Sequence, residues 1–175
     1  MRRVLVGLVW AAVALLVIFN IALLWGTRLP REHTTTRAMV LAEPPQKIWE
    51  AISDFQHETA WRTDLKSVVR MPDSQGMQVW RENDKTGGSQ ILGTEQTIPP
   101  TYMVRTIADD RSPVQGSWEF VLNPVASGTS VQITERGRIN NPFWRFMSAK
   151  IFRSAYIDDY LKMLAAKFGE KAKIS

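Results

Sequence analysis

The sequence contains no cysteine and only two histidines among its 175 residues. Without cysteine there can be no disulfide, no thiolate zinc site, no iron–sulfur cluster and no cysteine nucleophile. His33 falls in an expected linker and His57 among expected short helices, and neither has a second histidine at the spacing of a metal site. We therefore expect neither a metal nor a cofactor, and no catalytic residue is assigned.

Signatures of common enzymes and a large excess of charge are also missing. There is no GxSxG motif and no phosphate-binding glycine loop, and residues 86–88 read as a hairpin turn. The net charge is +5, but Arg2 and Arg3 precede an apolar segment, and the rest carries 20 basic against 17 acidic residues. The basic tail at 170–175 is typical of a solvated helix end. We expect no nucleic-acid binding.

The most distinctive feature is an uncharged run at residues 4–25, VLVGLVWAAVALLVIFNIALLW. As a helix these 22 residues reach about 33 Å, and a hydrocarbon core is about 30 Å thick. The run has no polar stripe, so it does not suit a core helix of a small domain. It also exceeds the apolar region of a signal peptide, and no small-x-small cleavage site follows it.

The sequence therefore predicts a single-pass membrane anchor over residues 1–27 and a linker over 28–33, with a cleaved signal peptide as the alternative. Arg2, Arg3 and the α-amino group precede the helix, whereas three arginines, Arg28, Arg31 and Arg37, follow it, so the positive-inside count is nearly balanced. A short basic N-terminus normally stays in the cytoplasm, which favours the domain on the extracytoplasmic side.

After the linker, the hydrophobic pattern has the period of strands, interrupted once by helices. Residues 45–53 begin with proline and repeat apolar residues at helical spacing, and a second short helix is expected near 55–61. Short connections with glycine, proline or aspartate separate the later strands, which indicates an antiparallel meander whose edge the first strand can join. The expected strands are 34–41, 66–71, 77–84, 89–97, 102–108, 116–122 and 129–139.

The last third of the domain returns to helical spacing. Asn141 and Pro142 suit a helix cap and first turn, and apolar residues then recur at three- and four-residue steps up to Phe168. This predicts one helix of about 27 residues lying along the curved sheet.

This order of elements, with AEPPQKIWEAISDFQHETAWRTDLKSV at 42–68 and GTSVQITERGRINNPFWRFMSAKIF at 128–152, resembles the SRPBCC superfamily of START-like and birch-pollen-allergen-like domains. The match is nearest to its polyketide cyclase/dehydrase-like branch and spans residues 34–169. The resemblance implies an α+β helix-grip fold, in which about seven antiparallel strands wrap a long C-terminal helix. It also implies an apolar cavity between helix and sheet.

Large aromatic residues are the candidate walls of such a cavity, and filling of the core is their ordinary alternative. We take as candidates Trp61, Trp80, Tyr102, Trp118, Phe120, Phe152 and Tyr156.

Three charged residues lie at two-residue spacing from apolar residues on expected strands and so share a strand face with them: Arg81, Glu95 and Glu135. Burying such groups is costly unless they pair, so Arg81 is a natural partner for Glu95 or Glu135. They could orient a ligand, act as an acid/base pair, or lie at the sheet rim in solvent.

Three functions remain open. The first is membrane-anchored binding of an apolar small molecule, such as a lipid, an isoprenoid or an aromatic metabolite. The second is a cyclase, dehydratase or hydrolase acting on such a ligand with Arg81, Glu95 or Glu135. The third is an interaction module with a solid core.

Overall fold

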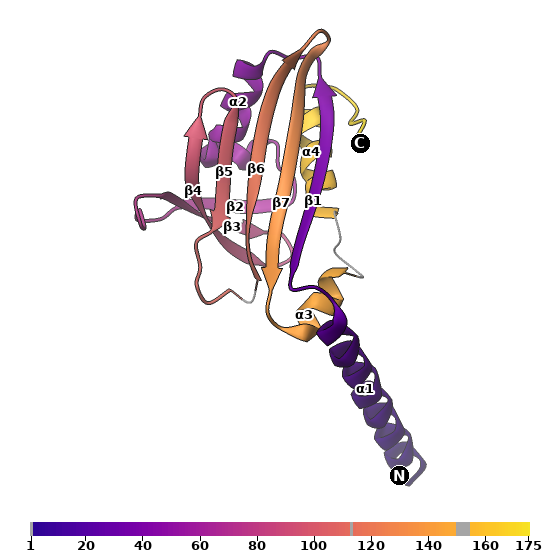
Figure 1. Ribbon diagram of the computed structural model, residues 1–175. Helices are drawn as coiled ribbons and strands as arrows, with labels where there is room; N and C mark the ends of the chain where they lie inside the picture. The colour runs from indigo at the N-terminus through magenta and orange to yellow at the C-terminus, as the bar shows by residue number, and fades with distance from the viewer. Residues whose placement is uncertain (1, 113, 150–154) are drawn as a thin grey trace.

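A computed structural model of the chain describes residues 2–112, 114–149 and 155–175. Seven strands form one sheet, and helices pack on one side of it (Figure 1). The elements are α1 (Arg2–Arg28), β1 (Glu32–Leu41), α2 (Pro45–Ser53), the 3₁₀ helix η1 (Phe55–Ala60), β2 (Leu65–Arg70), β3 (Gln78–Asp84), β4 (Ser89–Ile98), β5 (Tyr102–Ile107), β6 (Val114–Val125), β7 (Gly128–Ile139), α3 (Pro142–Met147) and α4 (Ala155–Lys167).

The strands form an antiparallel meander in the order β1-β7-β6-β5-β4-β3-β2. The first strand closes the edge beside the last, with Leu41 opposite Thr129 at one end and Glu32 opposite Arg138 at the other. Every strand predicted from the sequence is present, and its ends differ by at most three residues. The predicted α+β helix-grip class is therefore confirmed.

Side chains alternate between the two faces of each strand, and those on one face form the core. Met103, Phe120, Leu122 and Ile133 point to the face that α2 and α4 cover, and each is at most 5 % exposed. Figure 1 shows α2 and α4 on that same side of the sheet. The core is thus a layer between the sheet and these two helices.

The predicted single C-terminal helix is wrong in one respect: the structure describes two helices, α3 and α4, with different neighbours. Asn141 caps α3 as expected, its side chain accepting hydrogen bonds from the backbone N–H of Phe143 and of Trp144. However, α3 packs mainly against α1, with the rings of Phe143 and Phe19 5.4 Å apart, and has fewer contacts with the sheet. Residues 150–154, between the two helices, lie outside the described residues. Because α1 was expected to be separate from the domain, the contact between α1 and α3 was not predicted.

The two ends of the chain differ in how they meet the domain. The segment Val6–Arg28 within α1 is long and apolar enough to cross a membrane, and its most apolar 18-residue window has a mean hydropathy of 2.6. It extends away from the sheet (Figure 1). Because β1 begins at Glu32, the linker expected at 28–33 is shorter than predicted. The C-terminal segment expected as a basic tail returns to the sheet edge, where Ser175 and Ala38 exchange backbone hydrogen bonds. The ordered domain therefore extends to Ser175.

Burial along α4 makes a testable prediction. Leu161 is fully buried against the sheet, whereas the neighbouring Lys162 is exposed. We expect Leu161→Ala to lower the free energy of unfolding by about 2–5 kcal/mol, because it leaves a cavity in the core. Lys162→Ala should stay within about 0.5 kcal/mol of wild type in the same urea titration. Equal losses at both positions would show that the packed face of α4 is assigned incorrectly.

Candidate functional site

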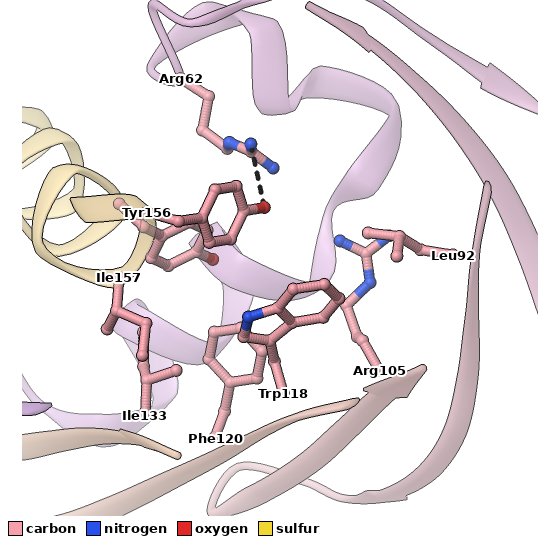
Figure 2. A pocket seen from close by; sticks show the side chains of 9 residues that line it. Arg62, Leu92, Arg105, Trp118, Phe120, Ile133, Tyr156 and Ile157 are labelled. Carbon is pink, nitrogen blue, oxygen red and sulfur yellow. Dashed lines mark hydrogen bonds between the residues drawn. The ribbon is translucent and has the colours of Figure 1, made fainter. Parts of the chain in front are cut away.

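A small cavity lies between α4 and the middle of the sheet (Figure 2). The volume open to the centre of a water molecule is about 10 Å³, which is room for one water and not for a larger ligand. Its wall is mostly apolar or aromatic but includes two arginines. The lining residues are Arg62, Leu92, Arg105, Trp118, Phe120, Ile133, Tyr156, Ile157 and Tyr160.

The two arginines belong to a buried charge cluster that consists of Glu58, Arg62, Glu82 and Arg105. None of the four is more than 4 % exposed. Glu82 lies between the arginines: its Oε2 accepts a hydrogen bond from Arg62 Nη1 at 2.6 Å, and its Oε1 accepts one from Arg105 Nη1 at 2.7 Å. At the margin, Asp64 accepts a hydrogen bond from Arg62 Nη2 at 2.7 Å. The cluster thus joins the segment around η1 to strands β3 and β5.

Glu58 is the least satisfied member of the cluster. Its carboxylate oxygens lie 3.6 Å from Arg62 Nη1 and 3.8 Å from Arg105 Nη1 and have no hydrogen-bond partner among the described residues. Burial raises the pKa of Glu58 from 4.5 to about 7, against the opposing effect of Arg105. Burial also acts to raise the pKa of Glu82, but Arg105 and Arg62 outweigh it and hold that pKa below its usual value.

The proton on Glu58 therefore sets the charge of the cluster. With Glu58 neutral, the two guanidinium groups are matched by the carboxylates of Glu82 and Asp64. With Glu58 ionised, one negative charge is left over in a region without solvent. A carboxyl group with a pKa near 7 in such a place is a candidate for proton transfer as well as for structure.

Arg105 is the member that presents free hydrogen-bond donors near the cavity. Its Nε and Nη2 are buried and have no partner among the described residues. One face of its guanidinium lies over the ring of Phe55, 4.1 Å from the ring centroid, which holds the group in place. Buried donors without acceptors are rare because each forfeits a hydrogen bond to water. An acceptor from a bound molecule would satisfy them.

Tyr156, at the start of α4, closes the other side of the cavity. Its ring lies 5.5 Å from that of Trp118, and Arg62 Nη2 donates a long hydrogen bond of 3.4 Å to its hydroxyl (Figure 2). Burial raises the pKa of this hydroxyl to about 12, so it stays protonated at neutral pH. The Tyr156 residue as a whole is 37 % exposed, so its side chain separates the cavity from solvent.

The aromatic candidates from the sequence fall into three groups. Trp118, Phe120 and Tyr156 line the cavity. Trp61 and Trp80 are buried in the core, where Trp61 packs on Tyr160 and Trp80 packs on Phe55. Tyr102 is half-buried and lies on the opposite face of β5 from Met103, and Phe152 lies outside the described residues.

The expected pairing of Arg81 with Glu95 or Glu135 is wrong. On β3 it is Trp80 and Glu82 that face the core, so Arg81 lies on the other face, opposite Val69 and Ile91. The register between β4 and β5 shifts between Thr94 and Gln96, and this bulge leaves Glu95 exposed.

Glu135 does follow the inward phase of β7, but its partners are different from those expected. Its Oε1 lies 2.9 Å from His33 Nε2, and its Oε2 accepts a hydrogen bond from Trp118 Nε1 at 3.2 Å. Arg81 is out of reach because three strands separate β3 from β7. Glu135 thus holds one wall of the cavity through Trp118 without lining the cavity itself.

None of the four cluster residues was predicted. One signal was present in the sequence: Arg105 sits between Met103 and Ile107, two residues from each, so it shares their buried face. For Glu82 the alternation along β3 was ambiguous. Val79 and Trp80 are consecutive apolar residues that face opposite sides of the sheet and are both buried, so they do not show which face of the strand meets the core. Glu58 lies in the short helix η1 and Arg62 lies just after it, and so short a helix does not show from sequence which of its polar residues are buried.

Comparison with known proteins gives the fold and no more. No protein-family model matches the sequence, and no curated protein matches it. A START superfamily protein from Mycobacterium smegmatis matches with a TM-score of 0.58 and 14% identity, over 77% of this chain and 96% of that chain. An aromatase/cyclase from a Streptomyces species matches with a TM-score of 0.59 and 14% identity, over 78% of this chain and 93% of that chain.

The di-domain aromatase/cyclase StfQ of the steffimycin biosynthetic pathway matches with a TM-score of 0.63 and 9% identity, over 77% of this chain and 50% of that chain. The domain therefore has the helix-grip fold of START-like and aromatase/cyclase structures, as the resemblance predicted.

The raised pKa of Glu58 predicts how stability depends on pH. An unfolded glutamate releases its proton near pH 4.5 and folded Glu58 near pH 7, so the folded state binds more protons in between. The contribution of Glu58 to the free energy of unfolding is therefore full below pH 4.5 and is lost as pH rises through 7. Glu58→Gln should remove a decline of about 2–3 kcal/mol between roughly pH 5 and pH 8.

The measurement is urea unfolding of the wild type and the variant at several pH values, with Glu50→Gln, an exposed change on α2, as the control. Glu50→Gln should leave the pH dependence unchanged. Parallel curves for the wild type and Glu58→Gln would contradict the assignment.

Proposed function

We propose that the domain binds an apolar small molecule that carries an oxygen acceptor, such as a lipid, an isoprenoid or an aromatic metabolite. One observation carries the proposal: two buried nitrogens of Arg105, Nε and Nη2, lack hydrogen-bond partners among the described residues beside a mostly apolar and aromatic cavity. Apolar walls with a few converging polar groups are typical of small-molecule sites. A carbonyl or hydroxyl oxygen would meet Arg105, and the apolar body would lie against Trp118, Phe120 and Ile133.

Binding requires the cavity to open, because the space between these side chains holds only one water. Tyr156 is the side chain that has to move. It is partly exposed. Its contacts with other described residues include the ring of Trp118, the guanidinium of Arg62 and a long hydrogen bond from that guanidinium. We infer that the ligand takes the place of the Tyr156 ring against Trp118.

We propose further that α1 anchors this domain to a membrane. Its support is the length and hydropathy of Val6–Arg28, and the fact that only 6 % of its most apolar window is buried within the structure. The alternative is a signal sequence that is removed. The side of the membrane on which the domain lies stays a prediction, with the extracytoplasmic side favoured by the short basic N-terminus.

Catalysis is the second candidate function, and one observation favours it. Glu58, with a pKa of about 7, lies within 3.8 Å of Arg105, which lines the cavity. A group with such a pKa can both take and give a proton at neutral pH. An enzyme of this kind would convert its ligand, and Glu58→Gln would slow the conversion by about 10²–10⁴-fold while binding persisted.

Binding can be tested with Nile red, an apolar dye that carries a carbonyl group. We expect Tyr156→Ala to raise the affinity for the dye by about 10-fold, because the ring no longer has to be displaced. Tyr102→Ala, which removes the same ring from the other face of the sheet, should leave the affinity unchanged. Absence of saturable dye fluorescence in both the wild type and Tyr156→Ala would contradict a ligand cavity and favour a solid core.

Anchoring can be tested by carbonate extraction of membranes followed by intact mass measurement. We expect the full chain to stay in the membrane pellet with its N-terminal segment present. A chain that lacks residues 1–27 should be released. Recovery of a protein whose mass lacks this segment would show that α1 is a cleaved leader.

A further inference from the structure

A second pocket lies where α1 meets the domain, and we call it the α1–α3 pocket. It is bounded by the chain just after α1, by β1 and β7, and by α3. Figure 1 shows these elements meeting at the end of the sheet next to α1. Its charged and titratable side chains are Arg31, His33, Glu135 and Arg145. The volume open to the centre of a water molecule is about 110 Å³, which exceeds that of the cavity under α4. This pocket can therefore hold a small group without rearrangement.

Arg145 is the most unusual side chain of the pocket. It is only 7 % exposed, and its Nη1 and Nη2 donate hydrogen bonds to the backbone carbonyls of Leu29 and Asn140, at 3.0 and 3.3 Å. Its Nε has no hydrogen-bond partner among the described residues, and no carboxylate in that part of the chain forms an ion pair with Arg145. No aspartate or glutamate occurs among the residues outside the described ranges, which are Met1, Pro113 and residues 150–154. A buried guanidinium without an anion is costly.

The remaining charges of the pocket do not supply that anion. The carboxylate of Glu135 is engaged by His33 at 2.9 Å and by Trp118 at 3.2 Å. The His33 ring reaches Glu135 by lying over Gly137, where any side chain would overlap it. Arg31 is exposed at the rim and adds a second cation. Positive charge thus exceeds negative charge even with His33 neutral.

We infer that the α1–α3 pocket binds a phosphate group, with Arg145 and Arg31 as its positive partners. Arginine is well suited to phosphate because its N–H groups form charge-assisted hydrogen bonds. Leu29 and Ile139 also line the pocket and give an apolar chain a surface to follow. The molecule that carries this phosphate follows from the proposed anchoring. If α1 crosses a membrane, the pocket lies at the level of the phospholipid headgroups, so the carrier is a phospholipid.

The test uses the full chain in dodecyl maltoside, a neutral detergent, with calorimetric titration of three probes. These are dihexanoyl-phosphatidylglycerol, glycerol phosphate and uncharged dihexanoylglycerol. The variants are Arg145→Gln and, as a matched control, Arg138→Gln, which removes an exposed cation near the same end of β7. We expect Arg145→Gln to weaken phosphatidylglycerol binding by about 10- to 100-fold, the range for a hydrogen bond to a charged group. Arg138→Gln should change it less than about 3-fold.

Arg145 also ties α3 to the end of α1, so Arg145→Gln could impair folding. Arg31→Gln provides a second variant, because Arg31 is exposed and has no structural hydrogen bond from its side chain among the described residues. It should weaken binding in the same direction by a smaller factor.

Phosphatidylglycerol that binds more tightly than glycerol phosphate would support the site and identify the carrier as a lipid. Equal affinities, both lost in Arg145→Gln, would support a phosphate site for a soluble ester. The inference is overturned if both arginine variants bind phosphatidylglycerol as the wild type does, or if dihexanoylglycerol binds equally well. Neither result bears on the Nile red titration, so failure here is distinguishable from failure of the proposed function.

Discussion

Glu82 is held between two arginines in a region that water does not reach, and the centre of the domain is arranged around this contact. Its two oxygens accept hydrogen bonds of 2.6 and 2.7 Å from Arg62 and Arg105. Buried ion pairs often add little net stability, but removing one partner leaves an isolated charge and typically costs about 3–5 kcal/mol. The segment after α2, strand β3 and strand β5 must therefore keep their relative positions. Glu58, whose pKa burial raises to about 7, completes the balance when it carries a proton.

The cavity under α4 has its polar end because of this cluster. Arg105 uses one nitrogen for Glu82, and its other two nitrogens are left without partners among the described residues. Phe55 on one side of the guanidinium keeps it from turning to find other acceptors. The opposite end, formed by Phe120, Ile133 and Ile157, offers only apolar surface. A ligand that fits this arrangement carries an oxygen at one end of an apolar body.

The sequence predicted the fold well because strand and helix periods are local properties. The cap at Asn141 and all seven strands depend on residues close in the chain. The site was harder because its charges meet through tertiary contacts between segments that are far apart, such as Glu58 and Arg105. A single bulge after Thr94 was enough to move Glu95 off the strand face on which it was expected. On β3 the inward face was assigned to Arg81, whereas Trp80 and Glu82 occupy it. The packing of α3 against α1, seen in the contact between Phe143 and Phe19, is likewise a tertiary contact between distant segments.

The central claim is that the space beside Arg105 is a binding site, and mass spectrometry of small molecules that co-purify with the detergent-extracted protein tests it most directly. The account predicts an apolar compound with a carbonyl or hydroxyl oxygen, present in wild-type protein and depleted when Ile133→Trp fills the cavity. Val121→Trp, placed on the outer face of the neighbouring strand, should retain it. The same compounds at the same abundance in all three preparations, or only detergent in each, would contradict the claim.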